Sequence, residues 1–107
     1  MIEIVIENLG NRVLQGDGAR PLLQIIHDGG VDWMHACGGK GRCTTCKAVV
    51  VEGNECLGPL TVHEERFRML GALHQNERLA CQARSTGNLK IQVPPEGKLP
   101  HINYSDD

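Results

Sequence analysis

Aromatic side chains are scarce in this sequence of 107 residues, which has one Phe, one Tyr and one Trp. Proteins that bind single-stranded nucleic acid stack the bases on aromatic rings, so the chain has little material for such a surface. It also has no excess of basic residues, because 11 Lys and Arg stand against 13 Asp and Glu, for a formal net charge of −2. Nucleic-acid-binding domains normally carry a basic patch. We therefore expect no nucleic-acid partner.

Long apolar runs are missing as well. No stretch of the sequence approaches the roughly 20 apolar residues that a transmembrane helix needs, and the first residues do not follow the pattern of a secretory signal. The five cysteines are an odd number, and three of them fall within ten residues, which is not the pattern of a secreted disulfide framework. We expect a monomer in the cytoplasm with no membrane insertion.

The order of strand-like and helix-like segments predicts an α+β fold. Thr61 followed by Glu64 is a capping box that begins a helix, and Pro94-Pro95 is expected to end the ordered domain. We predict strands at residues 2–7, 12–15, 47–52 and 89–93, an extended segment at 79–84, and helices at 21–28 and 61–73. These elements fit a mixed sheet of four or five strands on one main helix. Residues 1–107 are expected to form one domain, with a core of about 1–95 and a C-terminal tail of 96–107.

Three cysteines and three glycines crowd the stretch from residue 37 to residue 46. Cys37, Cys43 and Cys46 have the spacing C-x5-C-x2-C, and Cys81 follows after 34 intervening residues. Thiolates are ligands for iron–sulfur clusters, zinc and copper(I). Glycine reaches positive φ at little steric cost, so this loop can turn several backbone N–H groups toward the sulfurs. The stretch predicts a thiolate-ligated metal centre.

The spacing excludes several such centres. A 4Fe–4S ferredoxin has C-x2-C-x2-C, and a zinc ribbon has two C-x2-C knuckles where this chain has only the one from Cys43 to Cys46. A Rieske centre needs two histidine ligands, and no histidine of this chain follows a cysteine at the spacing C-x-H or C-x2-H.

The remaining pattern resembles the 2Fe–2S ferredoxin family over residues 1–95. The loop has one residue more than the plant-type spacing C-x4-C-x2-C, and is similar to the bacterial and mitochondrial, adrenodoxin-like branch. The resemblance extends to Cys37-Gly38-Gly39, Leu60-Thr61, Arg78-Leu79-Ala80-Cys81-Gln82 and Val93-Pro94. It implies a β-grasp fold with a protruding cluster-binding loop. It also implies one 2Fe–2S cluster, with Cys37 and Cys43 on one iron and Cys46 and Cys81 on the other.

The same resemblance assigns the loop residues around the cluster. They are Gly38, Gly39, Gly41, Arg42, Thr44 and Thr45. Their backbone N–H groups would donate to sulfur, and the two threonine hydroxyls offer further donors. Positive charge on Arg42 would raise the reduction potential and offers a contact for an acidic partner.

Partner docking in the adrenodoxin-like branch uses acidic residues on the helix after the cluster loop. Glu64 and Glu65 stand at that place, although Arg66 and Arg68 follow them. The fifth cysteine, Cys56, has no counterpart in the family pattern and is expected to be a small apolar or surface residue. Met34 and Met69 are expected in the core or shielding the cluster, and Trp33 at the base of the loop.

These features predict an electron-transfer protein and not an enzyme. We expect a soluble one-electron carrier between a ferredoxin reductase and a terminal oxidoreductase or oxygenase, with its chemistry supplied by the cluster. Two alternatives remain open at this point. One is a dedicated electron-delivery subunit of a single multi-component oxygenase or oxidoreductase, and the other is a structural zinc-binding interaction module.

Overall fold

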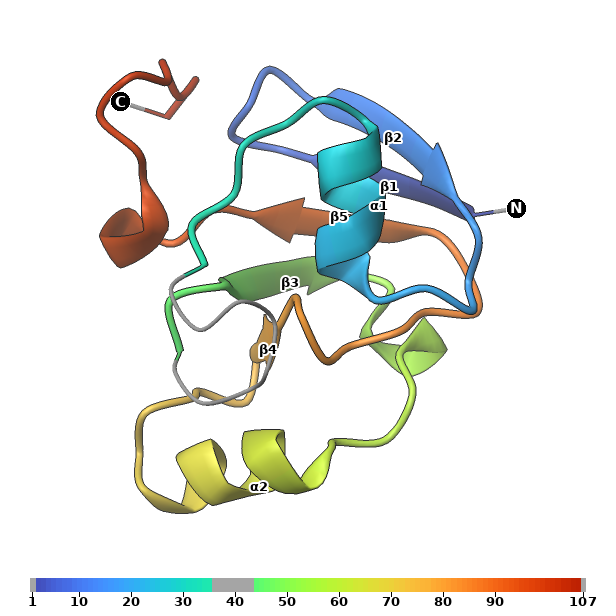
Figure 1. The fold of residues 1–107 in the computed structure, drawn as a ribbon, viewed down its shortest axis with the longest axis vertical. Helices are drawn as coiled ribbons and strands as arrows, with labels where there is room; N and C mark the ends of the chain where they lie inside the picture. The colour runs from blue at the N-terminus through green and yellow to red at the C-terminus, as the bar shows by residue number, and fades with distance from the viewer. Residues whose placement is uncertain (1, 36–43, 107) are drawn as a thin grey trace.

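The computed structural model describes residues 2–35 and 44–106, and their strands form one mixed sheet (Figure 1). The strands are β1 (Ile2–Ile6), β2 (Arg12–Gly16), β3 (Lys47–Glu52), β4 (Glu77–Leu79) and β5 (Leu89–Gln92). Their order across the sheet is β2-β1-β5-β3-β4. The central pair, β1 and β5, is parallel, and the other neighbours are antiparallel. The predicted mixed sheet is confirmed.

The sheet buries one face because its strands alternate. In β1 the side chains of Ile2, Ile4 and Ile6 are buried while Glu3 is exposed. Ile4 lies opposite Leu14 of β2 on one side and Leu89 of β5 on the other. Successive side chains of a strand point to opposite faces. The inward side chains therefore make one continuous apolar surface.

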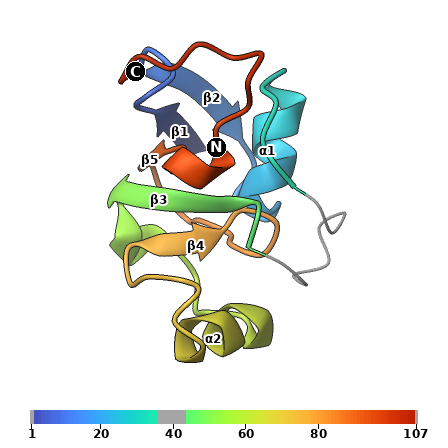
Figure 2. The same cartoon turned by 90° about the vertical axis from the view of Figure 1, so that its left-hand side faces the viewer.

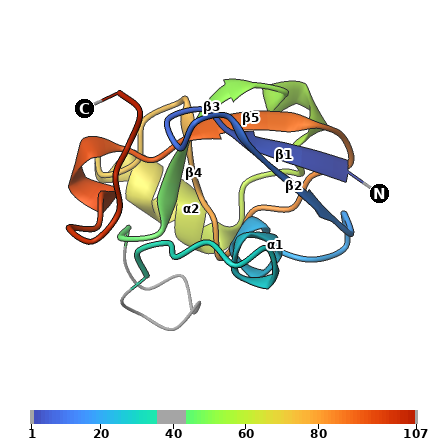
Figure 3. The ribbon, with the colours of Figure 1, turned by 90° about the horizontal axis from the view of Figure 1, so that it is seen from above.

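Helix α1 (Leu22–Asp28) covers that surface, as the turned views show (Figures 2 and 3). The helix lies very close to β2 because Gly16 has no side chain, and a Cβ there would fall 2.6 Å from Cγ2 of Ile25. Its apolar stripe, which is buried throughout, consists of Leu22, Leu23, Ile25 and Ile26. These residues and the strand residues form the main core.

Helix α2 (Val62–Met69) lies beyond the β4 edge of the sheet, away from α1 (Figure 1). Thr61 and Glu64 form the predicted capping box, with each side chain accepting from the other residue's backbone N–H. The helix is shorter than the predicted 61–73, because Gly71 turns the chain with φ of +74°. Two short 3₁₀ turns, η1 (Asn54–Cys56) and η2 (Pro95–Gly97), complete the elements.

The segment 79–84 is not extended, contrary to the prediction. The chain turns after Leu79, whose carbonyl accepts from the N–H groups of Gln82 and Ala83, at 2.9 Å each. The carbonyls of Ala80 and Ala83 then accept from the N–H groups of Leu23 and Leu22. The first N–H groups of a helix have no partner within it. The turn is therefore stabilised by serving as the N-terminal partner of α1.

The C-terminal residues do not leave the body of the protein after Pro94-Pro95. Tyr104 is buried, and its hydroxyl accepts from the Leu99 N–H at 3.0 Å. The N–H of Ser105 donates to the Asn8 carbonyl at 2.8 Å. The predicted tail thus folds back onto the turn between β1 and β2. The two chain ends therefore lie on opposite sides of the molecule (Figure 3). Within the described residues, no helix is both long enough and apolar enough to cross a membrane.

Candidate functional site

Two of the four cysteines that are predicted to bind the cluster lie next to each other in the described part of the chain. The Sγ atoms of Cys46 and Cys81 are 3.4 Å apart, and both residues are buried. A disulfide requires about 2.05 Å, so the two sulfurs are not bonded to each other. Two thiolates on one tetrahedral metal, with bonds of about 2.3 Å, lie about 3.8 Å apart. The pair therefore fits two ligands of a single metal ion.

The other two predicted ligands, Cys37 and Cys43, lie outside the described residues. The same holds for four of the loop residues expected around the cluster, which are Gly38, Gly39, Gly41 and Arg42. Thr44 and Thr45 are described, and both are half-buried next to Cys46. The Thr44 carbonyl accepts from the Lys47 N–H at 3.2 Å, which closes the turn that presents Cys46.

Two donors fix the backbone of Cys46. Its carbonyl accepts from the indole Nε1–H of Trp33 at 2.9 Å and from the Ala80 N–H at 3.2 Å. The Trp33 ring, expected at the base of the loop, is buried. A buried indole normally finds an acceptor for its N–H. Here the acceptor is the carbonyl of Cys46, so a buried core side chain fixes the backbone of a predicted cluster ligand directly.

Cys81 lies in the turn that follows β4. Its Sγ accepts from Nε2 of Gln82 at 3.8 Å. A hydrogen bond to sulfur favours the thiolate and is one of the factors that sets a cluster's potential. The Ala80 and Ala83 carbonyls on either side of Cys81 are bonded to α1, as described above. Cys81 is therefore held in place from both directions along the chain.

A buried ion pair fixes the strand that leads to Cys81. Both carboxylate oxygens of Glu64 accept from the Arg78 guanidinium, at 2.7 and 2.9 Å, and one also accepts from the Leu79 N–H at 2.9 Å. Arg78 donates further to the carbonyls of Gly58 and Pro59. Burial alone would raise the pKa of Glu64, but the hydrogen bonds from Arg78, Leu79 and Thr61 outweigh it, and the pKa is lowered. Glu64 is ionised inside the protein.

This pair corrects one sequence expectation. Glu64 is 0% exposed, so its carboxylate cannot contact a docking partner in this structure. Glu65 is exposed, as a docking residue must be. The two glutamates are neighbours in the sequence, but successive residues of a helix are turned by about 100° from each other. One is therefore buried and the other exposed, which a run of acidic residues cannot reveal.

Lys47, the residue after Cys46, has its positive charge paired with two carboxylates. Its Nζ lies 2.7 Å from Oε1 of Glu96 and 3.8 Å from Oε2 of Glu77. The hydrogen bond from Lys47 lowers the pKa of Glu96. Positive charge next to a cluster raises its potential. Two carboxylates offset the charge of Lys47, and Glu64 offsets that of Arg78.

Cys56 lies in η1 and is half-buried. Its carbonyl accepts from the Thr86 N–H at 2.9 Å, and its Sγ closely approaches Gly87, where a Cβ would fall 2.6 Å from the sulfur. It therefore packs as a small apolar residue against a neighbouring loop.

Residues 5–86 match a family model described as the 2Fe-2S iron-sulfur cluster binding domain. The chain belongs to the 2Fe–2S ferredoxin family. It is 33% identical to 2Fe-2S ferredoxin-5 of Aquifex aeolicus over 94 residues, which is 87% of this chain and 97% of that protein. It is 37% identical to a 2Fe-2S ferredoxin of Haemophilus influenzae over 84 residues, 77% of this chain and 74% of the relative.

Solved structures agree on the fold. An ISC-like 2Fe–2S ferredoxin from Pseudomonas putida superposes with a TM-score of 0.76 at 24% identity, over 92% of this chain and 97% of the other. The predicted β-grasp fold is therefore confirmed. This ferredoxin is an electron-transfer protein and not an enzyme, and it carries one 2Fe–2S cluster. The family assignment removes the zinc-module alternative.

Other relatives carry this domain within a longer chain. A component of the Na⁺-translocating NADH-quinone reductase of Psychrobacter arcticus is 34% identical over 90 residues, which is 84% of this chain but only 21% of that protein. The ferredoxin reductase of carbazole 1,9a-dioxygenase superposes with a TM-score of 0.67 at 25% identity, over 87% of this chain and 26% of that one.

Two parts of the site were not found from the sequence. The first is the bond from Trp33 to the Cys46 carbonyl, and the second is the pair of Glu64 and Arg78. The capping box was the only available sign of Glu64's role, because one Glu oxygen there already bonds the Thr61 N–H. The other oxygen of Glu64 accepts from Arg78, which is 14 positions away in the sequence. No local sequence pattern indicates a contact over that separation.

Proposed function

We propose that Cys37, Cys43, Cys46 and Cys81 are the four ligands of the 2Fe–2S cluster, with Cys46 and Cys81 on the same iron. The observation that supports this proposal is the 3.4 Å separation of two buried sulfurs that come from distant parts of the chain. Two buried cysteines at this distance without a disulfide can share one metal ion, which takes up the charge of the two thiolates.

The function of the protein is one-electron transfer, and the bound cluster supplies the oxidation and reduction. The chain's own residues hold the ligands: Trp33 and Ala80 fix Cys46, and the turn against α1 fixes Cys81. We propose a monomeric cytoplasmic carrier that accepts electrons from a ferredoxin reductase and delivers them to an oxidoreductase or oxygenase.

A second candidate is a dedicated electron-delivery subunit of one multi-component oxidoreductase. It is favoured by the relatives in which the same domain occupies about a fifth of a longer reductase chain. A stable stoichiometric complex with one oxidoreductase during co-purification would distinguish this candidate from a shuttle, which forms only transient complexes.

The ligand assignment is tested by single Cys→Ser variants of anaerobically purified protein. We expect Cys46→Ser and Cys81→Ser, like Cys37→Ser and Cys43→Ser, to lose or severely destabilise the cluster. The readouts are iron and sulfide content, visible absorption, and the EPR signal after reduction with dithionite. The matched control is Cys56→Ser, which removes a half-buried thiol outside the proposed site and should leave all three readouts at the wild-type level. A cluster that survives in Cys81→Ser but is lost in Cys56→Ser would contradict the assignment.

A further inference from the structure

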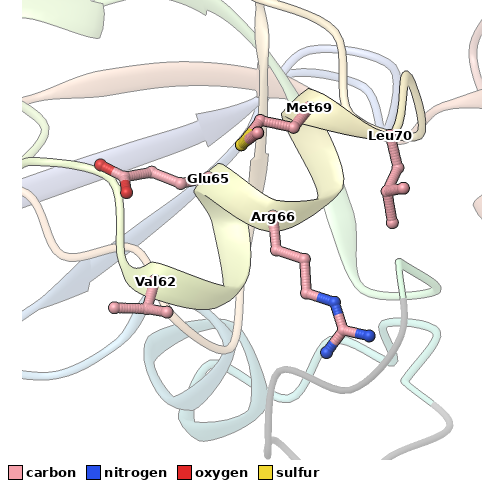
Figure 4. A pocket seen from close by; sticks show the side chains of 5 residues that line it. All are labelled: Val62, Glu65, Arg66, Met69 and Leu70. Atoms are coloured by element: carbon pink, nitrogen blue, oxygen red, sulfur yellow. The ribbon is translucent and has the colours of Figure 1, made fainter.

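The outer face of α2 carries large apolar side chains in water. Val62 is 79% exposed, Met69 is 89% exposed, and Leu70, directly after the helix, is 69% exposed. They are three of the five exposed large apolar residues in the described part of the chain. Together with Glu65 and Arg66 they line an open groove of about 390 Å³ (Figure 4). We call these five residues the α2 face.

The α2 face does not contribute to holding the helix in place. The only buried residue of α2 is Glu64, which bonds Arg78 and Leu79, while Phe67 packs against the core as a partly buried side chain. Apolar groups grouped in water on one small protein are characteristic of an interaction site. Since the helix is anchored through its other side, the exposed apolar groups are available to a partner.

The charges of the α2 face exclude an acidic docking patch. Glu65 and Arg66, one on each flank of the groove, carry opposite charges (Figure 4). Glu64 adds nothing at the surface because it is buried against Arg78. A contact made here gains its free energy mainly from apolar burial, at about 25 cal/mol per Å². Steering by net charge contributes little to it, so the contact should depend only weakly on salt.

The position of the helix suits electron transfer. The inward side of α2 bonds the backbone of Leu79, two residues before Cys81. A partner on the outer side is therefore separated from that strand by the Glu64 side chain and one helix, which is about 10–12 Å across with its side chains.

The size of the α2 face argues against a second copy of the chain as its occupant. Stable interfaces use about 20–30 residues from each partner, whereas electron-transfer encounters are at the small end of the range. Five residues on one short helix suit the second kind. We propose that the α2 face docks a redox partner that presents an apolar surface. This rests on the carrier function proposed above.

The test measures electron transfer to the holo-protein from a flavoprotein. The probe is the fastest donor to the wild type among a panel of NAD(P)H-dependent ferredoxin reductases. We expect kcat/KM for cluster reduction to fall at least about tenfold in Met69→Asp, as for a residue at the centre of an interface. Arg66→Gln should have a much smaller effect, and the wild-type rate should vary little with salt. The matched control is Val13→Asp, a 53% exposed apolar residue on β2, which should stay within about twofold of wild type.

Cluster content, the EPR signal and reduction by dithionite report whether each variant is intact. A Met69→Asp protein that is intact by these measures and is reduced by the reductase at the wild-type rate would overturn the docking proposal. So would a concentration-dependent wild-type dimer that Met69→Asp abolishes, because a second copy would then cover the face. If dithionite reduces the wild type but no reductase does, the carrier function fails, and the docking proposal fails with it.

Discussion

The two helices of this ferredoxin are attached to the sheet in opposite ways. All four apolar side chains of α1 are buried, and the helix lies against β2 with no room for a side chain at Gly16. By contrast, α2 buries one side chain, the charged Glu64, and turns Val62 and Met69 outward. The first helix is held by apolar packing, and the second by an ion pair and a capping box.

The difference teaches where the molecule can interact. A helix held by apolar burial has used its apolar face and has none left for a partner. A helix held by polar bonds needs little apolar contact, because each charge-assisted hydrogen bond is directional and strong. Its apolar residues are then free to face outward. The polar attachment of α2 is thus what allows it to offer an apolar surface on its outer side.

The largest effect should come from breaking the polar attachment by removing Arg78. Arg78→Met leaves Glu64 buried without its cation, and we expect a loss of about 3–5 kcal/mol in the free energy of unfolding. Chemical denaturation measures it. The double variant Glu64→Gln/Arg78→Met removes both charges, keeps a side-chain oxygen as an acceptor for the backbone N–H groups, and should recover part of the loss. A double variant no more stable than Arg78→Met alone would show that the pair does not act as a charge pair.

The apolar attachment of α1 should be nearly as sensitive. Ile26→Ala removes a fully buried side chain from the helix, and we expect a loss of about 2–5 kcal/mol. Val62→Ala on α2 is the matched control, since Val62 is mostly exposed and its truncation should change stability by no more than about 0.5 kcal/mol. Thermal or denaturant unfolding of both variants gives the comparison. Equal losses in the two helices would remove the contrast drawn here.

The smallest effect should appear in the pH dependence of the α2 attachment. The pKa of Glu64 in the folded protein is lowered from 4.5, so the stability that its charge contributes is fully present above pH 4.5 and is lost as the pH falls through the lowered value. At neutral pH we expect Glu64→Gln to cost about 1.5–3 kcal/mol, as for a hydrogen bond to a charged group. The difference between the two proteins should shrink as the pH is lowered below 4.5. A difference that is constant with pH would mean that the charge of Glu64 does not matter.

Elements with local signals were predicted well from the sequence. The alternation in β1, the apolar stripe of α1 and the capping box at Thr61 each depend on residues a few positions apart, and the structure contains all three. The family followed from the cysteine spacing and flanking motifs. Features that depend on distant residues were missed. Segment 79–84 was expected to be extended because its turn depends on bonds to α1.

The expectation for Met69 failed for a related reason. A methionine is usually an interior residue, and Met69 is expected in the core or shielding the cluster, yet it is the most exposed of the large apolar residues in the described part of the chain. Only the direction in which α2 is anchored decides this, and the anchor, Arg78, is nine residues further along the chain. The bond between Ser105 and Asn8, which holds the C-terminal residues in place, is equally invisible in the sequence.

The bond from Trp33 to the Cys46 carbonyl has a consequence for optical measurements. Trp33 is the only tryptophan of the chain, and it is buried with its indole N–H on the backbone of a proposed cluster ligand. All tryptophan emission from this protein therefore comes from one fixed point beside the redox centre. We expect the coloured cluster to quench that emission, so that loss of the cluster is measured as a rise in tryptophan fluorescence without any added label.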